Sequence, residues 1–264
     1  MLAVLTIILC LSMITLHELG HAYAMYKCGV PIKRIGLLGI PIKGIPFLKK
    51  EITLNGSLAT LEIHPLLIGA FVIPKDGSVE SQSTFNKVFI FGAGPMVNIF
   101  FGAVLLAIAG LKIDSVPFWG VQVWLLGWMP IIAVTIIIFF RPLCYFVAPV
   151  VGLLVLFPLV SALLSDNIQG SIGGPVTIVS VLSAGYAKIQ SLGIFATAFI
   201  AGIFSFLIGL TNFLPFAPLD GGQIYHAYLE KLSPFVGRYF YNFTFCLFLA
   251  LMCIALSNDL RIIF

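Results

Sequence analysis

Six stretches of this chain are long and apolar enough to cross a lipid bilayer, and they restrict the fold more than any other feature. A spanning helix needs about 20 predominantly apolar residues. Hydrophobic residues make up 60% of the chain and charged residues 9%, against roughly 45–50% and about 25% in soluble domains. We therefore expect an all-α polytopic membrane protein with about six transmembrane helices, forming a single integral membrane domain over residues 1–264. The predicted spans are residues 1–26, 85–111, 121–140, 143–164, 192–218 and 238–257.

The basic residues favour one orientation of these spans. If both termini lie outside, residues 27–84, 141–142 and 219–237 form the inner loops, and residues 112–120, 165–191 and 258–264 form the outer ones. All but three of the 14 lysines and arginines then lie inside or at the inner boundary, as the positive-inside rule requires. The exceptions are Lys112, Lys188 and Arg261. The first stretch has no basic residue before Lys27 and no cleavage pattern of a signal peptide, so we expect it to be retained as a span.

A metal-binding motif lies within the first stretch. His17-Glu18-Leu19-Gly20-His21 has the HExxH spacing, which on a helix places both imidazoles on nearly the same face. Both can then bind one zinc ion while Glu18 reaches its bound water. His17 would lie about 24 Å from the outer end of its helix, in a hydrocarbon layer of about 30 Å. The predicted site is therefore submerged but close to the inner face.

A second cluster of candidate functional residues lies at residues 212–222, around the end of the fifth stretch. Two prolines and two glycines there stop the helix and place Asp220 on a bend. Spans 1 and 5 both end inside, so Asp220 can reach the side of the membrane where the histidines lie. A catalytic zinc site has three protein ligands and one open position, and Asp220 is the best third ligand. The alternative is that Asp220 caps the bent end of a helix.

These residues resemble the site-2 protease family of intramembrane zinc metalloproteases. The match rests on HELGH and on Leu219-Asp220-Gly221, with support from residues 92–98 (Gly-Ala-Gly-Pro-Met-Val-Asn) and 173–176 (Gly-Gly-Pro-Val). The resemblance implies a zinc metalloendopeptidase that cleaves transmembrane segments of single-pass membrane-protein substrates. This member would lack the PDZ domain that one bacterial subgroup carries.

The resemblance also assigns roles to individual residues. His17, His21 and Asp220 would bind one Zn²⁺ per chain, and Glu18 would be the general base. Asn212 would position the substrate or help to stabilise the oxyanion. Asn98 would line the same cavity, with helix capping as its alternative role.

The long inner loop carries a different pattern. Residues 51–63 alternate apolar and polar side chains around Asn55-Gly56, which is typical of a two-residue β-hairpin turn. Gly36 to Leu48 is apolar but interrupted by glycine and proline, too short to span. We expect residues 36–75 to form a β-hairpin and a re-entrant segment at the membrane, with an ordinary cytosolic loop as the alternative. An extended substrate could add a strand to the edge of the hairpin.

The cysteines, the two other histidines and the distribution of basic residues bear on other possible functions. The five cysteines show no CxxC spacing and are expected to be buried apolar residues. We expect His64 and His226 to be interfacial histidines near the inner mouth of the site, with a role beside the metal ligands or in a substrate channel as the alternative. No basic patch suggests nucleic acid, so the expected partners are the bilayer and membrane-protein substrates. In a prokaryotic host the location would be the plasma membrane. The alternatives are a catalytically silent relative that binds membrane proteins and, less favoured, an ion transporter or channel.

Overall fold

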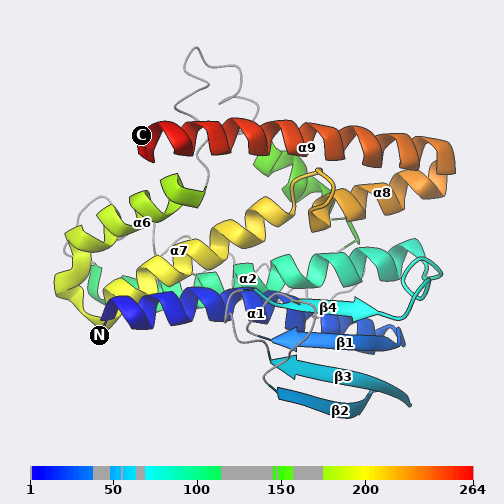
Figure 1. Ribbon diagram of the computed structural model, residues 1–264, viewed down its shortest axis with the longest axis horizontal. Helices are drawn as coiled ribbons and strands as arrows, with labels where there is room; N and C mark the ends of the chain where they lie inside the picture. The colour runs from blue at the N-terminus through cyan, green and yellow to red at the C-terminus, as the bar shows by residue number, and fades with distance from the viewer. Residues whose placement is uncertain are drawn as a thin grey trace.

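The computed structural model describes residues 2–37, 48–54, 56–63, 69–113, 145–146, 148–156 and 175–263. Within them the chain is mostly helical, with one small sheet (Figure 1). The helices are α1 (Leu2–Lys27), α2 (Thr84–Ile113), α6 (Pro175–Ile189), the 3-10 turn η1 (Gln190–Leu192), α7 (Ile194–Asn212), α8 (Asp220–Leu232) and α9 (Pro234–Ile263). The strands are β1 (Ile32–Leu37), β2 (Leu48–Leu54), β3 (Ser57–Ile63) and β4 (Phe71–Pro74).

Three helices in the described part of the chain are long and apolar enough to cross a membrane. They are α2, α7 and α9, at Thr84–Gly110, Ile194–Asn212 and Pro234–Arg261. They correspond to three of the six predicted spans. The stretch at residues 1–26 forms the helix α1, and its passage through the membrane stays a prediction. The predicted span at 121–140 and much of that at 143–164 lie outside the described residues, so six spans are not confirmed.

Two segments that we expected to be loops contain helices. The predicted outer loop 165–191 includes α6, and the predicted inner loop 219–237 consists largely of α8 and the start of α9. Neither α6, with 15 residues, nor α8, with 13, is long enough to span, so a search for spans passes over them. The start of α6 is fixed by Asp259 of α9, whose carboxylate accepts hydrogen bonds from the backbone N–H groups of Val176 and Thr177 at 2.8 and 3.0 Å.

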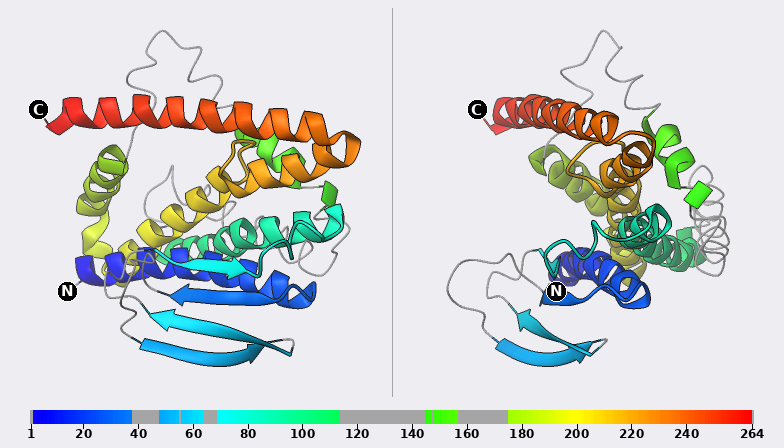
Figure 2. Two further views of the ribbon diagram at one scale, coloured as in Figure 1. Left: turned by 45° about the vertical axis from the view of Figure 1, so that its right-hand side comes forward. Right: turned by 90° about the vertical axis from the view of Figure 1, so that its right-hand side faces the viewer.

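Helices α1, α2 and α7 pack together, with α2 antiparallel to the other two (Figures 1 and 2). Glycine permits the close approach of α2 and α7. A Cβ atom at Gly102 would lie 2.7 Å from the backbone nitrogen of Phe206, and one at Gly209 would lie 2.7 Å from the carbonyl oxygen of Pro95. Small residues allow such backbone contacts between helices in membranes. Because α1 and α7 are parallel, their carboxyl ends point in the same direction, as the predicted topology requires.

The sheet is larger than the predicted hairpin. Its strand order is β2-β3-β1-β4, and β2 and β3 form the expected antiparallel hairpin, with Leu54 opposite Ser57. Strand β1 pairs in parallel with β3 and antiparallel with β4, and the side chain of Arg34 in β1 forms a salt bridge with the buried Glu62 of β3. The expectation of a re-entrant segment from residue 36 is thus wrong at Gly36 and Leu37, which belong to β1, while residues 38–47 lie outside the described part. Strand β4 lies beside α1, and β2 is outermost (Figure 1).

Candidate metal centre

The two histidines of the HExxH motif face the same point inside the helix bundle. They stand one turn apart on α1, and each has only 7% of its surface exposed. Their Nε2 atoms are 3.1 Å apart, and the ring planes are inclined by 81°. A helix places residues i and i+4 on one face, so the local structure alone accounts for this pairing.

Asp220 reaches the histidines from a segment far along the chain. After α7 ends at Asn212, the backbone turns through residues 213–219 and begins α8 at Asp220 itself. Asp220 Oδ2 lies 3.0 Å from His17 Nε2, and Oδ1 lies 3.4 Å from His21 Nε2. The N-cap of α8 is Leu219, without a side-chain capping bond. The alternative expectation, that Asp220 caps a bent helix end, therefore differs from the observed contacts.

The double glycine after Asp220 permits this turn. A Cβ atom at Gly221 would lie 2.3 Å from the carbonyl oxygens of both Phe213 and Leu214. The chain that leaves α7 therefore passes directly against the first turn of α8. The Leu-Asp-Gly-Gly sequence therefore begins α8 and also packs closely against the chain that leaves α7. Together these two features place the Asp220 carboxylate at the histidines.

The Nδ1 atoms of both histidines are directed away from the cluster, each toward a residue of α2. His21 Nδ1 is 2.7 Å from the carbonyl oxygen of Ile90, which can only accept, so Nδ1 carries the hydrogen and Nε2 carries a lone pair. His17 Nδ1 is 3.2 Å from the side-chain amide of Asn98. Metal-binding histidines usually hold their second nitrogen in this way.

The amide of Asn98 is informative because it is fully buried. Its Nδ2 faces His17, whereas its Oδ1 has no hydrogen-bond partner among the described residues. The two ends of a side-chain amide exchange by a 180° rotation, and the rotated amide presents Oδ1 as the acceptor that a protonated His17 Nδ1 needs. Asn98 lies in the interior of α2, so our alternative expectation of helix capping does not fit its position.

Gly94 of α2 leaves room for the cluster. A Cβ atom there would lie 2.4 Å from His21 Nε2 and 2.8 Å from His17 Nε2. A side chain would therefore occupy the space into which both nitrogens point. Gly94 belongs to the supporting motif at residues 92–98, but its role could not be predicted, because a missing side chain gives no chemical signal until its neighbours are known.

The donor set fits a zinc ion. Ligands at about 2.0–2.1 Å in tetrahedral arrangement lie about 3.3 Å from one another, and the cluster's contacts to the Asp220 oxygens and between the two imidazoles span 3.0 to 3.4 Å. His17, His21 and Asp220 form a group that could hold a metal ion. Three protein ligands leave one position open, which is the usual composition of a catalytic site.

Glu18 stands beside this group, between α1 and the sheet. Its carboxylate interacts electrostatically with both histidines and with Asp220, and it accepts a hydrogen bond from the backbone of Val72 in β4. The backbone N–H that holds Glu18 therefore comes from the edge strand nearest to α1. The role of Val72 could not be predicted from the sequence, because a backbone N–H group is present whatever the residue type.

Two further predicted residues in the described part of the chain do not join the cluster. The side-chain amide of Asn212 donates to the carbonyl of Ile208 in its own helix, at 3.0 Å. His226 lies on α8 with its ring centroid 5.5 Å from that of Tyr241, and it lines a separate polar pocket of about 360 Å³. In that pocket a hydrogen bond from Lys87 lowers the pKa of Glu230 below its usual value. His64 lies outside the described residues.

A group of two buried histidines and one half-buried aspartate, next to a glutamate and within a bundle of apolar helices, is the arrangement of a membrane metallopeptidase. The sequence model of peptidase family M50, the site-2 protease family, matches residues 5–252. The chain therefore belongs to this family, whose members are membrane-embedded zinc metalloproteases. The comparison with curated proteins returned no match.

Proposed function

We propose that this protein is an intramembrane zinc endopeptidase that cleaves the transmembrane segments of single-pass membrane proteins. The observation that carries the proposal is the convergence of His17, His21 and Asp220 on one point, with Glu18 beside them. Membership of family M50 supports the same activity. His17, His21 and Asp220 would hold one Zn²⁺, and Glu18 would be the general base.

The chain's own residues supply most of the proposed mechanism. When bound, zinc would acidify water and polarise the scissile carbonyl. Glu18 would take a proton from the attacking water and then give it to the leaving nitrogen. One positioned carboxylate would thus act first as general base and then as general acid. The hydrogen bond from Val72 holds Glu18 in place for both steps. Ile90 and Asn98 keep the histidine rings turned so that Nε2 faces the cluster.

The substrate must be extended where it is cut, because the carbonyls of a helix are occupied by hydrogen bonds. From the sequence we expected strand addition to the 51–63 hairpin. That position fits poorly, since β3 is an interior strand and β2 lies farthest from α1. We propose instead that the substrate pairs with the outer edge of β4, which within the described sheet pairs only with β1, beside Val72 and Glu18.

The decisive experiment compares wild type with Glu18→Gln after reconstitution with a panel of tagged single-span substrates. We expect wild type to bind about one zinc per chain and to cleave at least one substrate, and Glu18→Gln to retain zinc without cleaving. Glu51→Gln, which changes an exposed glutamate on β2, is the matched control and should cleave normally. Zinc binding without cleavage of any substrate by wild type would instead favour the silent, substrate-binding relative.

A further inference from the structure

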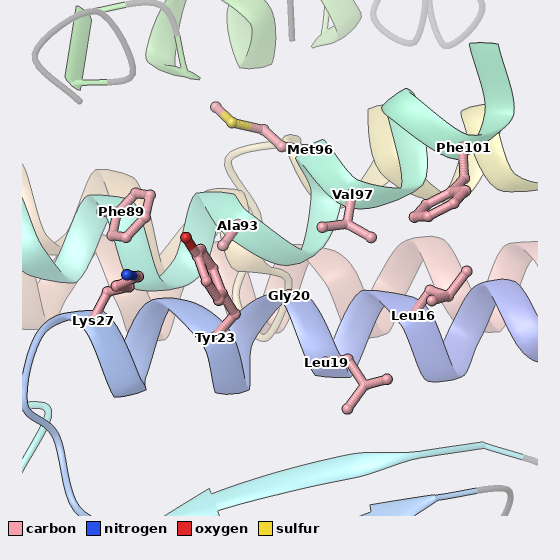
Figure 3. Close-up of a pocket in the computed structure, with 10 residues that line it drawn as sticks. All are labelled: Leu16, Leu19, Gly20, Tyr23, Lys27, Phe89, Ala93, Met96, Val97 and Phe101. Atoms are coloured by element: carbon pink, nitrogen blue, oxygen red, sulfur yellow. The ribbon is translucent and has the colours of Figure 1, made fainter. Parts of the chain in front are cut away.

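A groove of about 570 Å³ runs along α1 and α2 (Figure 3). On α1 its lining residues Leu16, Tyr23 and Lys27 point about 80–120° around the helix axis from His17 and about 120–160° from His21. The groove and the candidate metal centre therefore lie on different faces of α1. It is a second site, distinct from the one where a substrate bond would be cut.

The groove is apolar along its length and charged at one end. Its lining on α2 consists of Phe89, Ala93, Met96, Val97 and Phe101. On α1 the apolar part begins at Leu16 and the charged end is Lys27, the last residue of the helix (Figure 3). Within the described part of the chain, the exposed Lys27 ammonium forms no salt bridge and stands 5.6 Å from the centroid of the Tyr23 ring.

The length of the groove matches one leaflet of a bilayer. From Leu16 to Lys27, at about 1.5 Å per residue, it extends for about 16 Å, and half of a hydrocarbon layer is about 15 Å. A single cation at the interfacial end of an apolar channel of this length complements a molecule with one anionic head and a hydrocarbon tail.

A peptide fits this groove less well than a lipid tail. A helix about 10 Å across would have to place its side chains between two helices that already touch at Gly20 and Ala93. An extended peptide would leave its backbone groups unpaired against apolar walls, at a cost of several kcal/mol each. A hydrocarbon chain has neither problem.

We propose that this groove binds an anionic phospholipid, with an acyl chain between α1 and α2 and the phosphate at Lys27. The chain would pack against Gly20 and Ala93, which are in close contact at the floor of the groove, since a Cβ atom on Gly20 would lie 2.8 Å from the Ala93 carbonyl oxygen. His21 and Gly94 are the next residues along each helix. The bound lipid thus supports the helix pair that carries the metal centre from a different face of α1.

Native mass spectrometry of the purified full chain tests the headgroup assignment. Phosphatidylglycerol and phosphatidylcholine of matched chain length are titrated in separate experiments. One Lys near an anionic headgroup is worth about a five-fold difference in affinity, so wild type should prefer phosphatidylglycerol by about that factor. Lys27→Gln should abolish the preference. Lys49→Gln, which removes an exposed lysine on β2, is the control and should retain it. Equal preference in wild type and Lys27→Gln would overturn the assignment.

A second variant tests the acyl chain. Leu16→Trp fills the end of the groove away from Lys27 and should reduce retention of both lipids several-fold, while circular dichroism and size-exclusion profiles stay those of wild type. Unchanged lipid retention in a folded Leu16→Trp protein would contradict the site. Displacement of the lipid by a second copy of the chain, seen as a dimer that Leu16→Trp breaks, would also overturn the proposal.

Discussion

Two residues of α2, Gly94 and Asn98, shape the candidate metal centre without serving as metal ligands. Gly94 presents no side chain to the space into which the histidine Nε2 atoms point, and Asn98 presents a neutral amide to the back of His17. An aspartate in place of Asn98 would bring another negative charge to an apolar bundle, where charge is costly. The two histidines are thus oriented by a helix that contributes no ligand.

Gly94→Ala should abolish zinc binding without unfolding the protein. The added methyl would lie 2.4 Å from His21 Nε2, so that both histidine rings would have to move. The matched control is Gly92→Ala, two residues earlier on α2, where the nearest atom to a new Cβ is 3.8 Å away. Zinc content of the purified variants, measured by atomic emission, gives the result. Equal zinc content in the two variants would show that Gly94 does not adjoin the metal.

Asn98→Ala should weaken zinc binding by about 10–100-fold, the usual effect of losing the residue that orients a histidine ligand. Asn98→Asp restores an acceptor for His17 Nδ1 and should recover part of the affinity. Competition with a chelator of known affinity measures both variants. Asn86→Ala, at the start of α2, is the control. If Asn98→Ala binds zinc as wild type does, the amide has no orienting role.

At the scale of elements, the sheet and α1 form one unit at the site. Strand β4 lies against α1 and holds Glu18 through Val72, while β2 and β3 extend away from it. The hairpin was predictable because Asn55-Gly56 and the alternation around it are local signals. The position of β1 between β3 and β4 was not predictable, because parallel pairing across a long connection leaves no local pattern.

Val72→Pro should abolish cleavage and leave zinc bound. Proline removes the backbone N–H that contacts Glu18 and blocks pairing at the outer edge of β4. Leu48→Pro is the control, since it lies at the first residue of the outermost strand, where proline is tolerated. Cleavage assays and zinc analysis of both variants check the expectation. Loss of cleavage in Leu48→Pro alone would assign substrate pairing to β2, as we expected from the sequence.

At the scale of the whole molecule, apolar length and charge bias predicted much of the helical framework. The helices α2, α7 and α9 follow directly from apolar runs, and the parallel course of α1 and α7 follows from counting crossings. The short helices α6 and α8 were missed because they are too short to span. Asp220 was identified from its motif, but the way α8 begins at that residue depends on contacts between Gly221 and the chain leaving α7.

The predicted topology places the loop before α2 on the cytoplasmic side. Ser81 is exposed in that loop, so Ser81→Cys should react with an impermeant maleimide in inside-out membrane vesicles and stay unlabelled in intact cells. The parent protein, with its own cysteines, provides the background. Ser257→Cys, an exposed position near the far end of α9, should show the reverse pattern. Labelling of Ser81→Cys from outside would invert the proposed orientation of the site.

The distance in sequence between the proposed zinc ligands also has a consequence for biosynthesis. His17 and His21 belong to the first helix, whereas Asp220 is added about 200 residues later in translation. At about 5–20 residues per second, roughly 10–40 s separate the two events. During that interval the chain holds an incomplete centre that lacks its carboxylate ligand. Under the proposed function, the nascent chain would therefore be inert toward its neighbours at the site of insertion until Asp220 has been added.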